Sequence, residues 1–219
     1  MRLVQSLHRA YPGLTYDVTI KVEHLLKHAG LLPVLRDTGC VLVTSAVESV
    51  DDKVLEILDK GHTREDVVRV VRFCREAGLN LAPTFVTFTP WLSLEGYAGL
   101  LSFIEDLNLV ESVAPVQLAI RLLITAGSRL LERAEVQSVI GRFDEASLSY
   151  QWAHPDPRVD ELQRRVEALV AQMQKQHASR TGIFREVRRL TDSSAGSLWH
   201  QPPLPAQCTV PYLTEPWFC

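Results

Sequence analysis

The stretch from Val41 to Thr63, VLVTSAVESVDDKVLEILDKGHT, constrains the fold more than any other part of the sequence. It opens with an apolar, largely β-branched run at positions 41–44, which has the length and composition of a buried strand. A polar segment at positions 45–49 follows and predicts a turn. Apolar residues then recur at three- and four-residue spacing until Gly61, and they predict a helix built on Val54, Leu55, Ile57 and Leu58. The stretch therefore predicts one strand–turn–helix unit of an α/β fold.

Glu48 is the first candidate for a functional residue, because it lies where this strand is expected to end. Ligands of parallel α/β folds bind at the carboxyl ends of the strands. The alternative is structural, because Ser45 with Glu48, or Ser49 with Asp52, has the spacing of a helix capping box. The second pair can cap the helix alone, which leaves Glu48 free, so both interpretations stay open at this point.

The rest of the chain predicts the same alternation of strands and helices. Helical patterns cover 2–10, 23–36, 63–78 and 93–107, and strand patterns cover Asp17–Val22, Asn80–Phe88 and Val116–Leu123. Four strands separated by helices indicate a parallel sheet or a segment of a barrel with its helices outside. A long helix from Asp156 to about Gln176 and a shorter one over 183–190 follow, and regular structure is not expected from Thr191 onward.

One face of each predicted strand is apolar, whereas the other carries Lys21, Thr44, Gln117 or Arg121. In a fully packed parallel fold both strand faces are apolar, and a charge that is buried without a partner is costly. These polar positions are therefore expected to line a cavity that holds water, a ligand or opposite charge. The alternative is an internal network of ion pairs, in which Glu23 and Glu48 bind Lys21 and Arg121 and only position the strands.

The composition argues against several classes of function. The 219 residues carry a formal net charge of −3, so electrostatics gives no reason to expect nucleic acid or an anionic membrane as a partner. Apolar runs stay well short of the ~20 residues that span a bilayer, and the N-terminus lacks the apolar segment of a signal peptide. Scattered cysteines suit a reducing compartment, so the expected location is the cytoplasm.

The four cysteines fall into two groups. Cys40 and Cys74 occupy apolar patterns and are expected to be core residues. Cys208 and Cys219 lie in an irregular, proline-broken segment, where a thiol can be reached by solvent, a metal or another thiol. They are the candidate catalytic residues, and the alternative is a tail with incidental cysteines. The sequence contains no CxxC, no HExxH-type metal spacing and no phosphate-binding glycine loop.

Several blocks resemble a known superfamily when they are taken in order. The runs are YDVTIKVEHLL, GCVLVTSAVESVDDKVLEILDKGHT, LAPTFVTFTPW and PVQLAIRLLITAGSRLLE, and the last ten residues read VPYLTEPWFC. The first four resemble radical S-adenosylmethionine (SAM) proteins over about residues 1–133. Together with the tail, they resemble the CUAEP/CCAEP-tail radical SAM (seleno)protein family.

This resemblance implies an α/β fold with a partial parallel (βα) barrel over residues 1–133. The helical pattern of the sequence predicts a helical extension over 134–190, and an irregular tail over 191–219 follows. It implies a [4Fe-4S] cluster and SAM at the carboxyl ends of the strands, where reductive cleavage of SAM gives a 5′-deoxyadenosyl radical. The substrate, a small molecule or a peptide, is not identified. By position, Ser45 and Glu48 would lie near the ribose or methionyl group. Lys21 and Arg121 would face the SAM carboxylate or the substrate, and Thr84 would form part of the adenine wall.

The sequence departs from this family at both ends. The CxxxCxxC cluster motif is absent, so the chain is expected to be an inactive fragment of a longer enzyme. The chain also stops at Cys219, where selenoprotein members continue with selenocysteine. A UGA codon read as a stop is the expected cause, and the alternative is a real truncation or a frameshift. The rival interpretation is a cluster-free barrel remnant that serves as a structural or interaction module.

Overall fold

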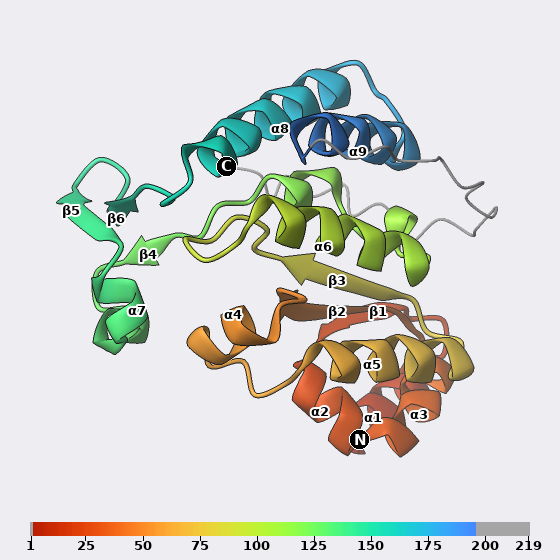
Figure 1. Ribbon diagram of the computed structural model, residues 1–219. Coiled ribbons are helices and arrows are strands. Elements are labelled where there is room, and N and C mark those ends of the chain that lie inside the picture. The colour runs from red at the N-terminus through yellow and green to blue at the C-terminus, as the bar shows by residue number, and fades with distance from the viewer. Residues whose placement is uncertain (1, 196–219) are drawn as a thin grey trace.

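A parallel three-stranded sheet in the order β1-β2-β3 organises the computed structural model, which describes residues 2–195 (Figure 1). Its strands are β1 (Tyr16–Thr19), β2 (Cys40–Glu48) and β3 (Leu81–Phe85). Each crossover is helical: α2 (Val22–Lys27), a 3₁₀ turn η1 (Ala29–Leu31) and α3 (Leu32–Asp37) join β1 to β2, and α4 (Asp52–Ile57) and α5 (Arg64–Glu76) join β2 to β3. The predicted α/β class with a parallel sheet is confirmed.

Local capping signals explain where several helices begin. Thr63 and Asp66 form a reciprocal capping box at the start of α5, and Ser93 accepts a hydrogen bond from the backbone N–H of Gly96 at the start of α6 (Leu94–Asp106). Asp156 caps α8 (Pro157–Lys175), whose first residue is proline. These helices lie where the sequence predicts them.

One hydrophobic core joins the sheet to its helices. Its fully buried members come from every major layer, for example Leu25, Val43, Val67, Leu101 and Val166. In Figure 1, α2, α3 and α5 lie on one side of the sheet, and α6, α8 and α9 (Arg180–Ala195) lie beyond β3. The long C-terminal helices therefore complete the core rather than extend away from it.

A second, antiparallel sheet in the order β4-β6-β5 lies beside the parallel one, and the sequence pattern did not predict it. Its strands are β4 (Ile124–Thr125), β5 (Ile140–Asp144) and β6 (Ser149–Trp152), with η4 (Arg129–Glu132) and α7 (Ala134–Gln137) before β5. We call this unit, residues 124–152, the small sheet. The division of the chain into domains at residue 133 stays a prediction.

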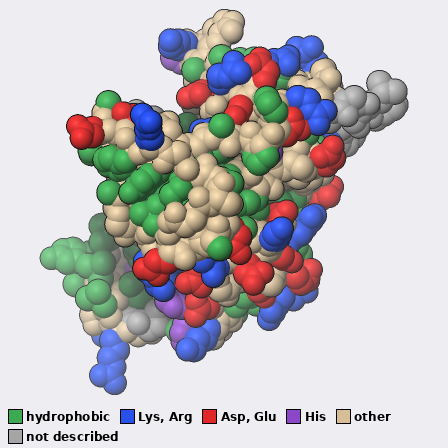
Figure 2. Space-filling view, turned by 60° about the vertical axis from the view of Figure 1, so that its left-hand side comes forward, with side chains coloured by type: hydrophobic (Ala, Val, Ile, Leu, Met, Phe, Trp, Pro, Cys, Tyr) green, Lys and Arg blue, Asp and Glu red, His purple; other side chains and the backbone are tan. Residues whose placement is uncertain are grey.

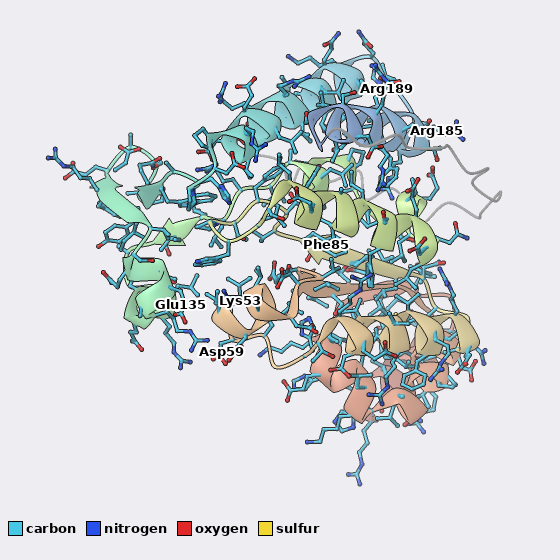
Figure 3. The ribbon with its side chains drawn as sticks, viewed as in Figure 1. Lys53, Asp59, Phe85, Glu135, Arg185 and Arg189 are labelled. Atoms are coloured by element: carbon cyan, nitrogen blue, oxygen red, sulfur yellow. The ribbon has the colours of Figure 1, made fainter. Side chains whose placement is uncertain are left out.

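The small sheet packs against the end of α4. Ile57 belongs to the same buried cluster as Ile124, Val136 and Trp152. The Arg133 guanidinium donates hydrogen bonds to the carbonyl oxygens of Glu56 and Ile57, which lie at the C-terminus of α4. Figure 3 shows the labelled Lys53 of α4 and Glu135 of α7 on neighbouring parts of the molecule. Three large apolar side chains in or next to the small sheet are exposed, namely Leu123, Phe143 and Leu148. Figure 2 shows hydrophobic side chains grouped on the face of the molecule that it displays.

The predicted strand at Val116–Leu123 is wrong. Pro115–Leu118 forms a 3₁₀ turn, η3, in which the N–H of Gln117 binds the carbonyl oxygen of Ala114. Only one parallel bridge, between Phe88 and Arg121, remains of the expected fourth strand within the described residues. The Gln117 side chain explains part of the difference, because its Oε1 accepts the N–H of Phe85 at 2.8 Å and replaces a main-chain partner on that edge of β3.

The predicted turn at 45–49 also differs from the structure, because β2 continues through Glu48. Neither predicted capping box forms at α4. Asp51 is the N-cap and accepts hydrogen bonds from the N–H groups of Lys53 and Val54, while the Ser49 hydroxyl accepts the N–H of Asp51. The structural alternative for Glu48 as a capping residue is therefore wrong.

The N-terminal helix α1 (Arg2–Ala10) has the predicted bounds. It packs only loosely, because Leu3 is 81% exposed and no residue of α1 is buried. Within residues 2–195, no helix is long and apolar enough to cross a membrane.

Candidate functional site

The two faces of the parallel sheet differ in what covers them. Val43, Ser45 and Val47 alternate on one face, and all three are buried on the side of the helices. The opposite face carries short side chains that remain partly or fully accessible. Pairing of the strands places Thr19 beside Thr44 and Ala82, and Ala46 beside Thr84. We call these five residues the open face.

Glu48 lies at the carboxyl edge of the open face in an unusual backbone conformation. Its φ is 68°, in the left-handed region that a residue with a side chain rarely adopts. The N–H of Ser49 donates to the carbonyl oxygen of Val47 at 2.9 Å, so Glu48 is the central residue of a three-residue turn. The register with β3 also shifts between Ala46 and Glu48. Such a bulge redirects a side chain, and strain of this kind gathers at functional sites.

The partner of the Glu48 carboxylate is Lys60, which the sequence pattern did not reveal. Lys60 Nζ lies 2.9 Å from Glu48 Oε1, and the two side chains are 25% and 20% exposed. The strand pattern had predicted Lys21 or Arg121 in this place. Lys60 belongs to the loop after α4, and Gly61, with a φ of 69°, turns this loop back toward the end of β2. A β carbon at Gly61 would lie 3.5 Å from Oε2 of Glu23, so the loop also borders the start of α2.

The remaining predicted SAM-binding residues lie in three different environments. Thr84 is on the open face, and Lys21 is exposed at the start of α2, where the chain leaves β1. Ser45 is fully buried on the helix side of β2, and its hydroxyl has no hydrogen-bond partner. The structure therefore brings Thr84 and Glu48 to the same end of the sheet and separates Ser45 from them.

Among residues 2–195, the contacts of the Arg121 side chain are with Asp160 and Trp152 and do not include Glu48. Its guanidinium forms an ion pair with Asp160 of α8 at 2.7 Å and donates to the carbonyl oxygen of Trp152 at 2.6 Å. It also stacks on the Trp152 ring, 3.5 Å from the centroid. The expected network of ion pairs is therefore replaced by two separate pairs, Glu48 with Lys60 and Arg121 with Asp160. The sequence did not reveal either Lys60 or Asp160 as a partner.

The cysteines within the described residues are unsuited to an iron–sulfur cluster. Residues 2–195 contain no group of three or more His, Cys, Asp or Glu side chains that could hold a metal ion. Cys40 and Cys74 are buried and not in a disulfide, as expected for core residues. Burial raises the pKa of both thiols, that of Cys74 to about 11. A [4Fe-4S] cluster therefore does not fit this part of the chain. Cys208 and Cys219, the candidate catalytic residues, lie outside the described residues.

The two core thiols are expected to resist alkylation in the folded protein. Burial keeps reagent away, and at about pH 8 the raised pKa of Cys74 leaves only on the order of 0.1% thiolate. Mass spectrometry after a brief iodoacetamide pulse measures this directly on the peptides that contain Cys40 and Cys74. The same pulse in denaturant is the control, and rapid labelling of Cys74 without denaturant contradicts the packing described above.

Comparison with known proteins shows which solved structures share this fold. No protein-family model matches the sequence. The bacteriochlorophyllide d C-8(2)-methyltransferase of Chlorobaculum tepidum is 32% identical over 79 residues, which are 35% of this chain and 17% of that protein. Two structures of the cobalamin-dependent S-adenosylmethionine radical enzyme OxsB, one with aqua-cobalamin and one with aqua-cobalamin and S-adenosylmethionine, match with a TM-score of 0.63. The chain therefore shares the fold of the matched part of OxsB.

The likeness to OxsB concerns the fold, because sequence identity is 13% over 74% of this chain. The chain spans 30% of the length of OxsB and 17% of the length of the methyltransferase. The mixed α/β architecture expected from the sequence is thus supported, whereas the superfamily, the tail family and their chemistry belong to the proposals below.

Proposed function

We propose that this chain forms part of a radical SAM enzyme and binds SAM at the carboxyl ends of β1, β2 and β3. The observation that carries the proposal is the partly exposed Glu48 carboxylate, held in a strained turn at the carboxyl edge of the open face. The fold shared with OxsB supports the same location, because ligands of parallel α/β folds bind at this edge. Bound SAM, when reduced by an iron–sulfur cluster, supplies a carbon-centred radical that removes hydrogen from a substrate.

The residues at this edge offer the groups that SAM needs. SAM carries an ammonium group and a ribose diol, and a carboxylate such as Glu48 accepts hydrogen bonds from either. Thr84 offers a hydroxyl on the open face, where the short side chains of Ala46 and Ala82 are also partly exposed. Lys21 supplies a positive charge that attracts the SAM carboxylate. Ser45 and Arg121 have no part in this proposal, because the structure places them in the helix-side core and beside Asp160.

The [4Fe-4S] cluster of the proposal needs ligands from outside residues 2–195, because the described residues hold no suitable group. The chemistry assigned to the whole enzyme, and its small-molecule or peptide substrate, depend on those ligands. What this chain contributes by itself is the binding and orientation of SAM, and that contribution can be tested without a cluster.

Replacing Glu48 with glutamine is expected to weaken SAM binding about tenfold, the effect of losing one charge-assisted hydrogen bond. Isothermal titration of the purified chain with SAM measures the dissociation constant. The variant also loses the ion pair with Lys60, so its unfolding free energy is expected to fall by about 1 kcal/mol, because the pair is only partly buried.

Glu161→Gln is the matched control, because it removes another ion-paired carboxylate, 2.6 Å from Arg164, on the distant helix α8. Its SAM affinity should equal that of the unchanged chain. Equal affinity in Glu48→Gln as well would refute the assignment of Glu48.

A second candidate function is a structural or interaction module without a cofactor. The observation that favours it is the lack of a metal-binding group among the described residues. Titration of the unchanged, folded chain separates the two candidates: binding of SAM supports the enzyme, and no heat of binding at millimolar SAM supports the module.

A further inference from the structure

Aromatic side chains of the small sheet and of the loop beside it are only partly covered by residues 2–195. Phe143 of β5 is 37% exposed, and its ring meets that of the half-buried Tyr150 of β6 edge to face, with 5.2 Å between the centroids. Trp91, in the loop between β3 and α6, is also half-buried and packs against the same buried cluster as Tyr150. We call these three side chains the aromatic surface. Large apolar side chains that gather at a surface mark sites of interaction.

The contacts of α9 show in which direction this helix runs along α6. Arg180 and Thr181, in the first turn of α9, donate hydrogen bonds to Glu111, which follows the C-terminus of α6. Further along α9, the Arg188 guanidinium donates to the carbonyl oxygen of Ala98 of α6 at 3.0 Å. The helix α9 is therefore antiparallel to α6 and advances toward the N-terminus of α6, and Figure 1 shows the two helices next to each other.

The end of α9 consequently lies beside the start of α6. The helix continues from Arg188 to Ala195, a stretch of about 10 Å at the α-helical rise of 1.5 Å per residue. The stretch of α6 from Ala98 back to its first residue, Leu94, covers only about 6 Å on the same scale. Trp91 comes shortly before Leu94 in the sequence. The chain therefore passes position 195 close to the loop that carries Trp91.

The sequence that follows position 195 suits an aromatic surface. Residues 196–219 contain one acidic residue, Glu215, and no lysine or arginine. They contain five prolines and four large aromatic residues, Trp199, Tyr212, Trp217 and Phe218. Proline-rich segments bind surfaces lined with aromatic side chains, because they lose little conformational entropy on binding. The stretch from Ala195 to Trp199 spans about 13 Å when extended, so Trp199 can reach the loop of Trp91.

We propose that residues 196–219 bind the aromatic surface of their own chain. Three observations support this occupant: the end of α9 beside the loop of Trp91, the apolar and proline-rich composition of the segment, and the aromatic rings that residues 2–195 leave partly exposed. The inference goes beyond the proposed function, because binding of the segment requires neither SAM nor a cluster.

A nitroxide spin label on Cys208 tests the proposal in the full chain. The substitution Cys219→Ser leaves Cys208 as the thiol expected to react, because Cys40 and Cys74 are buried. Paramagnetic broadening should weaken the amide signals of β5, β6 and the loop of Trp91, and it should leave those of α5 unchanged. Amide signals that keep their intensity throughout β5 and β6, or that weaken equally in α5, overturn the proposal.

Substitutions on both sides of the contact test its chemistry. Phe143→Asn removes part of the aromatic surface and should abolish the broadening in β6. Leu3→Asn is the control, because Leu3 is an 81% exposed apolar residue on the distant helix α1, and it should leave the broadening unchanged. Trp199→Ser changes the segment itself and should weaken the broadening, so the test does not depend on the folding of Phe143→Asn. Broadening that survives in the folded variants at both positions overturns the proposal.

A mixed sample shows which copy of the chain supplies the segment. Chains that carry the nitroxide but no ¹⁵N are mixed with ¹⁵N-labelled chains that carry no nitroxide. We expect no broadening of the ¹⁵N-labelled chains, because each aromatic surface is occupied by its own segment. Broadening of β5 and β6 in this sample would mean that a second copy supplies the segment, and it would overturn the proposal.

Discussion

Replacing Arg188 with methionine is expected to lower the free energy of unfolding by about 3–5 kcal/mol, the cost of removing one partner from a buried ion pair. Arg188 of α9 lies between two buried carboxylates, 3.2 Å from Asp192 and 3.8 Å from Glu105 of α6. Its guanidinium also donates to the carbonyl oxygen of Ala98 and to the hydroxyl of Ser102. The variant leaves both carboxylates buried without this cation. Denaturant unfolding monitored by circular dichroism measures the loss.

Arg189→Met is a matched control on the same helix. Arg189 pairs with Glu186, its side chain is 74% exposed, and Figure 3 shows it on the outer side of α9. Its substitution should change the unfolding free energy by less than about 0.5 kcal/mol. Similar losses in the two variants would contradict the buried network.

The cost of Arg188→Met should also depend on pH. Burial raises the pKa of Glu105 above its usual value near 4.5, and Arg188 opposes this shift. The folded state therefore binds more protons than the unfolded state, so stability falls as the pH rises from about 4.5 through the folded-state pKa. Without Arg188 that pKa rises further and the fall deepens. The variant should be closest to the unchanged chain below about pH 4.5 and should differ most near neutral pH.

Replacing Arg121 with methionine is expected to cost about 2 kcal/mol and to loosen the small sheet. The backbone of Arg121 forms the bridge to Phe88. Its guanidinium forms an ion pair with Asp160 of α8, donates a hydrogen bond to the carbonyl oxygen of Trp152 of β6, and stacks on the Trp152 ring. Each contact contributes on the order of 1 kcal/mol at a partly buried site. Hydrogen exchange should accelerate over residues 124–152 and remain unchanged in α5.

The exposed Arg129 gives the control, because Arg129→Met removes a guanidinium from the same region. It should leave both stability and exchange unchanged. The Arg121 variant also decides between the structural role and the SAM contact expected from the sequence. If the Arg121 variant keeps its stability but binds SAM more weakly, the result would support the SAM contact that the sequence predicted for Arg121.

Local signals in the sequence predicted where α5 and α8 begin, because a helix start is specified by residues that lie close together in the chain. Thr63 with Asp66, and Asp156 before Pro157, fix α5 and α8 without help from the rest of the chain. The strands depend on their neighbours instead. Ser45 and Ala46 have the composition of a turn, but they pair with Pro83 and Thr84 and so extend β2. Tertiary pairing overrides local preference at such positions.

The candidate site was predictable in location but not in its contacts. The position of Glu48 after an apolar strand was enough to select it, because ligands gather at the carboxyl ends of strands. Its partner Lys60 is 12 residues further on and meets it only because Gly61 reverses the chain. The partner of Arg121, Asp160, is 39 residues away on α8, beyond the small sheet that the pattern of the sequence did not reveal. Ion pairs between distant elements leave no local trace.

The open face also affects how ligand binding can evolve in proteins that contain this sheet. Its residues project away from the hydrophobic core that stabilises the molecule, since Val43 and Val47 occupy the other side of the same strand. Enlarging Ala46 or Ala82 would therefore reshape the space above the strands without opening a cavity in that core. Substitutions on the open face can then change the ligand that the sheet binds while the free energy of unfolding stays nearly the same. Such separation lets a lineage explore new ligands through single substitutions while each intermediate still folds.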